Sequence, residues 1–222
     1  MKSSFNKGES GKTRKIKMNE VKAKTEKEQS PKNLEEARTS HWLFSRRGPA
    51  FLDPIVRIFD HSVRLVEPHI KKGQVVADIG CGWGYYSFAL ADLIGPEGKI
   101  YSVDLAKKCI HVIQKKAEKR GYHNIEAHAS TAANLSFISD RSVDFVFANG
   151  LLCSMAIDRK LAVNEMKRIL KPTGMAYLSL GSPPPFGYVD QLEWEDILDG
   201  FKVEQGGSFK ELWGLVSLKQ EV

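Results

Sequence analysis

Cysteine is scarce in this chain of 222 residues, and its three occurrences, Cys81, Cys109 and Cys153, are scattered and odd in number. A framework of paired disulfides is therefore not expected, and no two of these cysteines have the spacing of metal ligands. The pattern favours a reducing, cytoplasmic location and predicts no metal site.

Long apolar runs are also missing. None approaches the roughly 18–20 residues that a helix needs to cross a bilayer, and no apolar stretch follows the basic start at residues 1–5. We therefore expect neither a transmembrane helix, nor a secretory signal, nor a membrane partner. With 42% hydrophobic and 27% charged residues, the composition is that of a soluble globular protein.

The positive charge is concentrated at the N-terminus. Residues 1–32 carry a net charge of +6, which equals that of the whole chain, so the remainder is balanced. This segment has few apolar residues at no regular period and cannot offset the entropy of ordering, so it is predicted to be a disordered basic tail. Two interpretations stay open: a solvated leader without a partner, or an arm that binds an acidic partner such as RNA or an acidic protein.

Residues 33–222 are predicted to form one folded domain, with N-terminal helices at 33–70 and a core at 71–222. Apolar residues in the first part recur at helical spacing, and Pro68 marks the end of its last helix. The core then alternates short apolar runs with helical segments. The runs are 75–79, 100–103, 125–129, 143–148 and 175–180, and the helices between them are 85–93, 106–120 and 158–170.

Apolar runs separated by helices of this length predict a parallel sheet covered on both faces, as in a doubly wound α/β fold. The end of the chain differs, because no helix fits between the runs 201–204 and 212–218. These two are expected to be antiparallel strands at one edge of the sheet, with a glycine-rich turn at 205–208.

A glycine loop, DIGCGWG at residues 78–84, lies where the first strand ends and the first core helix begins. In open α/β sheets this is the position of the ligand crevice. A dinucleotide fingerprint would need a third glycine where Tyr85 stands, which argues against a nicotinamide-dependent oxidoreductase. Gly80, Gly82 and Gly84, preceded by Asp78, suit the carboxylate and ammonium of an amino acid.

The second strand ends at Asp104. A carboxylate at this position can accept hydrogen bonds from the two hydroxyls of a ribose. By itself it is more often the N-cap of the following helix, but next to the glycine loop we favour the ribose interpretation.

Together these segments resemble class I S-adenosylmethionine-dependent methyltransferases. The resemblance covers roughly residues 70–222 and is carried by four motifs in order. These are VADIGCGWG at 76–84, Asp104, DRSVDFVFAN at 140–149 and EMKRILKPTG at 165–174, which is read as the end of a helix followed by a turn. It implies a seven-stranded, mostly parallel Rossmann-like sheet whose last strand is antiparallel, with S-adenosylmethionine across the carboxyl ends of the strands.

The resemblance also implies a set of cofactor contacts. The loop should line the methionine part, Asp104 and Leu105 the ribose and adenine, Thr131 and Ala132 the adenine edge, and Asn149 the sulfonium. The segment 129–134 lacks the carboxylate that many relatives place there. The implied cofactor-binding residues are Asp78, Gly80, Cys81, Gly82, Gly84, Asp104, Leu105, Thr131, Ala132 and Asn149.

The chemistry needs little from the protein beyond alignment of the acceptor and exclusion of water, and a general base is needed only for an acceptor that begins protonated. Weak candidates for such a base are His41, Tyr85 and His61, each of which is more often structural. We expect a methyltransferase acting on a small molecule or a protein side chain. An inactive cofactor-binding scaffold or regulatory protein that binds partners through its basic tail is the alternative, and an RNA methyltransferase is less favoured.

Overall fold

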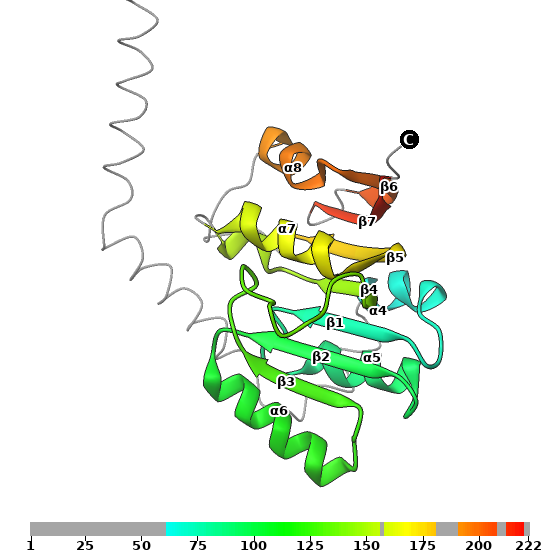
Figure 1. Cartoon of the computed structure of the whole chain (residues 1–222), viewed down its shortest axis with the longest axis vertical. Helices are drawn as coiled ribbons and strands as arrows, with labels where there is room; N and C mark the ends of the chain where they lie inside the picture. Colours follow the sequence, from blue (N-terminus) through cyan, green and yellow to red (C-terminus); the bar gives the residue numbers. More distant parts are fainter. Residues whose placement is uncertain (1–60, 156–157, 181–190, 208–211, 220–222) are drawn as a thin grey trace, which may run out of the picture. The chain divides into compact units, whose positions relative to one another are not determined.

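The computed structural model describes residues 61–155, 158–180, 191–207 and 212–219 (Figure 1). The predicted tail at 1–32, the segment 33–60 and His41 lie outside these residues, as does the side chain of His61. None of the helices that the structure describes is long and apolar enough to cross a bilayer.

Strands and helices alternate through the described residues. In chain order they are α4 (His61–Val66), η2 (Glu67–His69), β1 (Val75–Ile79), α5 (Tyr85–Ile94), β2 (Lys99–Asp104), α6 (Lys107–Arg120), β3 (Ile125–Ala129), β4 (Val143–Ala148), η3 (Leu152–Ser154), α7 (Arg159–Ile169), β5 (Leu170–Ser179), α8 (Gln191–Leu198), β6 (Phe201–Gly207) and β7 (Trp213–Leu218).

The seven described strands form one sheet in the order β3-β2-β1-β4-β5-β7-β6. Strands β1 to β5 pair in parallel, whereas β7 is antiparallel to both β5 and β6. The predicted fold class, including the antiparallel strand near the end of the chain, is confirmed. The direction of winding reverses between β1 and β4, which is where ligands bind in open α/β sheets.

Two predicted turns are wrong. Residues 172–174 lie inside β5, and residues 205–207 lie inside β6. The pairing register shifts in both places. In the β4–β5 pair the shift lies between Val143 and Phe145 of β4, and in the β6–β7 pair it lies between Val203 and Gln205 of β6. Such irregularities accommodate glycine and proline within a strand, so residues that signal a turn in the sequence are absorbed by the sheet here.

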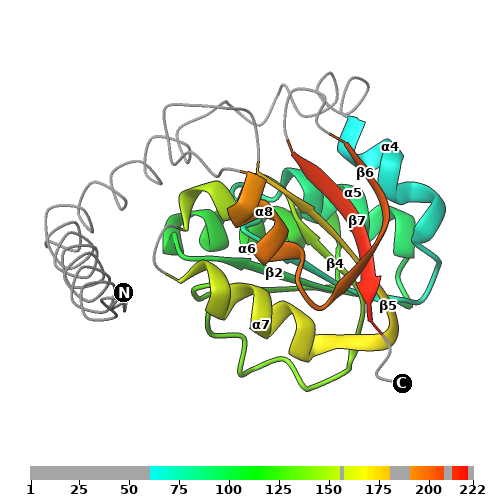
Figure 2. The same ribbon diagram turned by 90° about the horizontal axis from the view of Figure 1, so that it is seen from above.

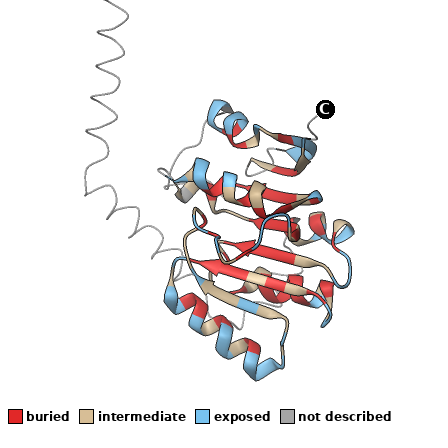
Figure 3. Ribbon diagram, in the orientation of Figure 1, coloured by how far each residue is buried: buried red, intermediate tan, exposed pale blue. Residues whose placement is uncertain are grey.

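Helices cover both faces of the sheet (Figure 2). On one face, Leu90 and Ile94 of α5 pack with Phe145 and Phe147 of β4. On the other, Met166 of α7 belongs to a cluster with residues of α8 and the central strands. Buried residues run through the central strands, while the outer side of α6 is exposed (Figure 3). Burial on both faces explains why the parallel strands are nearly continuous in apolar residues.

Candidate functional site

The predicted cofactor residues meet at one edge of the sheet. Because β1 to β4 are parallel, their carboxyl ends lie together. The glycine loop follows β1, Asp104 ends β2, Thr131 follows β3 and Asn149 follows β4. Residues scattered over 72 positions of sequence are thereby brought to the edge where the winding reverses.

The loop after β1 is shaped by its backbone. The amides of Gly80 and Cys81 donate to the carbonyl of Val103, at 2.8 and 3.0 Å, and the amide of Gly84 donates to the carbonyl of Cys81 at 2.9 Å. Gly82 has a φ of +51°, and a Cβ at this position would meet no described atom within 4 Å. The loop therefore leaves open space beside Gly82 that any side chain there would fill.

Gly84, in contrast to Gly82, has close packing neighbours. A Cβ on this residue would come within 2.6 Å of Cγ1 of Ile113, at a φ of +82°. Its missing side chain lets the start of α5 approach α6 closely. Gly82 and Gly84, both predicted as cofactor-binding, thus differ in the space around them.

Asp104 is tied to the glycine loop. One carboxylate oxygen accepts the amide of Gly82 at 2.9 Å, and the other accepts the amide of Ala106 at 2.8 Å. The side chain is buried, and a carboxylate oxygen can accept hydrogen bonds from more than one donor. The N-cap of α6 is Ala106, so the alternative reading of Asp104 as that N-cap is wrong.

Asp78 is a buried carboxyl group at the end of β1. Burial raises its pKa to about 7; the hydroxyl of Ser87, which donates to Asp78 at 2.6 Å, opposes this rise, and the nearby charge of Asp104 adds to it. A cation bound between these two acidic groups would favour the ionised form of Asp78. The site is therefore suited to an ammonium group.

The surroundings of Cys81 disfavour its thiolate form. Burial raises the pKa of its thiol well above the usual value, and the negative charges of Asp78 and Asp104 raise it further. Because the thiolate is the reactive form of cysteine, Cys81 acts here as a small buried side chain of the loop.

The segment after β3 begins beside Asp104, whose carbonyl accepts the amide of Ser130 at 3.1 Å. The hydroxyl oxygen of Thr131 accepts the amide of Ala133 at 3.3 Å, and Ala132 is buried in the core. On the other side of Asp104, Leu105 is 56% exposed. The residues predicted to border the adenine thus lie on both sides of the ribose-binding candidate.

Asn149, at the end of β4, is held by two hydroxyl groups that the sequence analysis missed. Its amide nitrogen donates to the hydroxyl of Tyr86 and its amide oxygen accepts from the hydroxyl of Ser179, both at 2.5 Å. The hydroxyl of Ser179 also accepts the amide of Gly150 at 3.1 Å. The Asn149 side chain thus links the start of α5 to the end of β5. The ring of Tyr85 packs edge-on against that of Tyr86.

Comparison with known proteins decides the family. Residues 70–202, more than half of the chain, match a family described as a methyltransferase domain. The chain belongs to this family.

Among curated relatives of this methyltransferase domain, a demethylmenaquinone methyltransferase of Geobacillus stearothermophilus is 33% identical over 121 residues, which are 54% of this chain and 51% of that protein. The chain thus spans about half the length of the curated relatives it matches.

Solved structures share the fold of the methyltransferase domain. A SAM-dependent methyltransferase from Aquifex aeolicus superimposes with a TM-score of 0.58 at 22% identity, over 74% of this chain and 98% of that one. A [4+2]-cyclase superimposes with the same TM-score at 19% identity, over 65% of this chain and 57% of that one.

S-adenosylmethionine, the cofactor that the family and fold imply, fits the residues present. Its ammonium suits the buried carboxyl of Asp78, and its ribose hydroxyls suit the buried carboxylate of Asp104 as an acceptor. The open space at Gly82 leaves room between them. In addition, the buried indole N–H of Trp83 has no hydrogen-bond partner in the described part of the chain, and it is a donor available to a carboxylate.

Proposed function

We propose that this chain transfers the methyl group of S-adenosylmethionine to a small-molecule acceptor. The proposal rests on one observation: Asp104 is locked to the amide of Gly82, beside buried Asp78, at the edge where the winding of the sheet reverses. The curated relatives, named as demethylmenaquinone methyltransferases, favour a small organic acceptor over a protein side chain or RNA.

In the proposed reaction S-adenosylmethionine supplies a methyl group already activated by its sulfonium. The chain itself binds and orients the cofactor and the acceptor. Asp104 holds the ribose hydroxyls, ionised Asp78 balances the ammonium, and the Gly82 backbone allows close approach. Tyr86, Asn149 and Ser179 fix the end of β4, beside which the acceptor would enter. Alignment within about 3–3.5 Å and exclusion of water then provide most of the rate enhancement.

A second candidate is a protein that binds the cofactor without transferring its methyl group. The fold similarity to a [4+2]-cyclase favours keeping this candidate, because one fold serves several chemistries. In that case the basic tail at residues 1–32 would supply contacts to an acidic partner. The free cysteines Cys81, Cys109 and Cys153 support a cytoplasmic location in either case.

Two measurements test the proposal. Isothermal titration of the full chain should show binding of S-adenosylhomocysteine and none of NADH; the reverse ranking would reject the cofactor. Radiolabelled S-adenosylmethionine should then label the small-molecule fraction of a cell lysate. Label in the protein or RNA fraction would change the acceptor class, and binding without any labelled fraction would favour the second candidate.

A further inference from the structure

The loop at 130–142, between β3 and β4, contains no helix or strand. It begins beside Asp104 and carries Thr131 and Ala132, and it ends at β4. A segment without regular structure needs other partners for its backbone groups. Two of its carbonyls are bound by the side chain of one arginine on α7, about thirty residues further along the chain.

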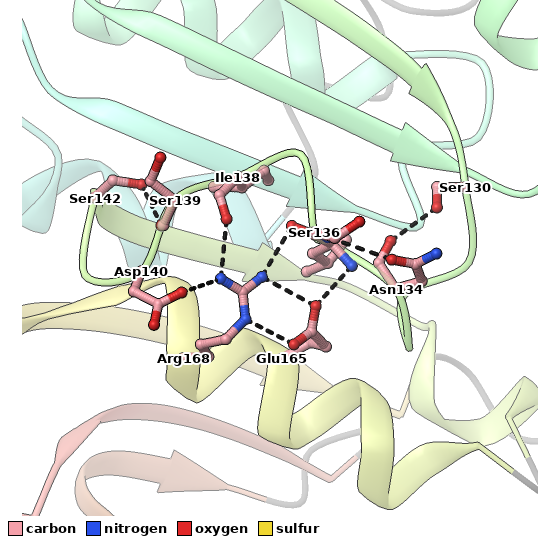
Figure 4. Close-up of polar contacts among 10 residues, drawn as sticks. Ser130, Asn134, Ser136, Ile138, Ser139, Asp140, Ser142, Glu165 and Arg168 are labelled. Atoms are coloured by element: carbon pink, nitrogen blue, oxygen red, sulfur yellow. Dashed lines mark hydrogen bonds and ion pairs between the residues drawn. The ribbon is translucent and has the colours of Figure 1, made fainter.

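Arg168 uses all of its hydrogen-bond donors on this loop and its supports (Figure 4). Its guanidinium donates to the carbonyls of Leu135 and Ile138, at 2.9 and 3.0 Å, and to the carboxylate of Asp140. Two further bonds, at 2.7 and 3.0 Å, run to the two oxygens of Glu165. Five bonds match the five N–H groups of a guanidinium, so the arginine is saturated.

Glu165 completes the arrangement from the same helix. One of its oxygens accepts the amide of Leu135 at 2.7 Å, and the hydrogen bonds from Arg168 lower its pKa. Both backbone groups of Leu135 are therefore bound by this pair. The side chains of Leu135 and Ile138 are fully buried, which fixes the loop to the core at the same two points.

The held position lies close to the proposed cofactor. The amide of Asn134 donates to the carbonyl of Thr131 at 3.0 Å, and the hydroxyl of Ser130 donates to the carbonyl of Asn134 at 2.8 Å. A short hydrogen-bonded turn thus connects Leu135 to Thr131 and Ala132. The backbone between Leu135 and these residues is constrained by these bonds.

We infer that the Arg168–Glu165 pair is a positioning device for the adenine wall of the crevice, formed by residues 130–134, an inference that rests on the proposed function. The pair does not touch the cofactor. It holds the loop backbone in the one arrangement that places Thr131 and Ala132 beside Asp104, and so sets cofactor affinity from a neighbouring helix. Lysine cannot replace Arg168, because it offers three donors without the planar fork.

The chain offers a matched control at the opposite ends of the strands. There the carboxylate of Asp144 accepts the amide of Val75 at 2.9 Å and pairs with Lys171 at 2.8 Å. This pair has the same chemistry as Glu165 with Arg168, a carboxylate that binds one backbone amide and one cation. It lies at the amino ends of β1 and β4, away from the crevice.

The test compares the full-length variants Arg168→Lys, Glu165→Gln and Asp144→Asn by isothermal titration and thermal unfolding. We expect Arg168→Lys and Glu165→Gln to raise the Kd for S-adenosylhomocysteine by about tenfold. Asp144→Asn should lower the melting temperature with an unchanged Kd. Glu165→Gln decides the matter if Arg168→Lys fails to fold, because it keeps the shape of the side chain.

A second readout separates positioning from mere stability. The wild type should prefer S-adenosylhomocysteine over S-inosylhomocysteine, whose base carries oxygen in place of the adenine amino group, and the ratio of the two Kd values should fall towards one in Glu165→Gln. An unchanged ratio, or an equal loss of affinity in Asp144→Asn, would overturn the inference. A wild type that binds neither ligand would reject the proposed function itself.

Discussion

The loop after β1 and the loop after β3 lie at the same edge of the sheet, where we propose that the cofactor binds, but they are held by different means. In the first, amides of residues 80 and 81 bind the carbonyl of Val103, and glycine provides the required backbone angles. In the second, the carbonyls of Leu135 and Ile138 depend on the side chain of Arg168. One wall is therefore specified by local backbone conformation, and the other by a polar contact from a distant helix.

The largest loss of cofactor affinity is expected when a side chain is added to the glycine loop. Gly82→Val places a side chain in the open space next to Asp104 at a φ of +51°, and should weaken binding of S-adenosylhomocysteine by about a hundredfold or more. Gly95→Val is the control, because Gly95 has a φ of +69° with equally open surroundings but ends α5. Both substitutions should lower stability, because both glycines have a positive φ. Equal loss of affinity in isothermal titrations of the two variants would contradict the assignment.

Asp104→Ala is expected to cost about ten- to a hundredfold in affinity, the value of a charge-assisted hydrogen bond. The structure adds a second consequence: the amides of Gly82 and Ala106 lose their acceptor. The melting temperature should therefore fall as well. Titration and thermal unfolding measure the two effects, and unchanged affinity would remove Asp104 from the site.

Asp78 should make binding depend on pH. Since its pKa in the folded protein is about 7, the ionised fraction, and with it the affinity for a ligand carrying an ammonium, should rise about tenfold from pH 6 to pH 8. Asp78→Asn should bind more weakly and without this dependence. A pH profile that is the same in both proteins would place the ammonium elsewhere.

The raised pKa of Asp78 also makes the stability of the folded protein depend on pH. A carboxyl group whose pKa is raised on folding stabilises the folded state below its unfolded pKa, about 4, and this contribution is lost as pH rises through 7. Without ligand, Asp78→Asn should therefore melt at a higher temperature than the wild type at pH 8 and show no such gain at pH 4. Thermal unfolding at the two pH values checks this.

The smallest effect is expected from Ser87→Ala. Removing a donor that lowers the pKa of Asp78 should move the midpoint of the binding profile upwards by less than about one pH unit. Ser142→Ala, which removes a hydroxyl bond to the carbonyl of Ser139 in the other loop, should leave the midpoint unchanged. A downward shift in Ser87→Ala would contradict the cause given for the pKa.

The contrast between the walls also explains what could be predicted from the sequence. The strands at 75–79, 125–129 and 143–148 match the predicted ranges, because continuous apolar runs follow from burial on both faces. The glycine loop and Asp104 could be placed at the crevice because topology alone brings strand ends together. Features that depend on local backbone conformation and on the order of the strands can therefore be predicted from the residue pattern.

Side-chain contacts across the fold leave a weaker signal. Glu165 and Arg168 stand at i and i+3 on α7, a spacing that usually marks a surface ion pair, and nothing in the sequence shows that Leu135 is their partner. The contacts of Asn149 with Tyr86 and Ser179 likewise join three separate segments. The turn predicted at 172–174 is likewise replaced by a part of β5, opposite the register shift between Val143 and Phe145 of β4.

The position of Arg168 has a consequence for biosynthesis. The ribosome synthesises the chain from its N-terminus, so Val103 and Asp104 emerge soon after the glycine loop whose amides they bind. The segment 130–142 can form its hydrogen bonds to Arg168 only after that residue has been synthesised, about thirty residues later, and after α7 has packed against the sheet. With the positioning role proposed for Arg168, nascent chains would complete the adenine wall late, after most of the parallel sheet has been synthesised.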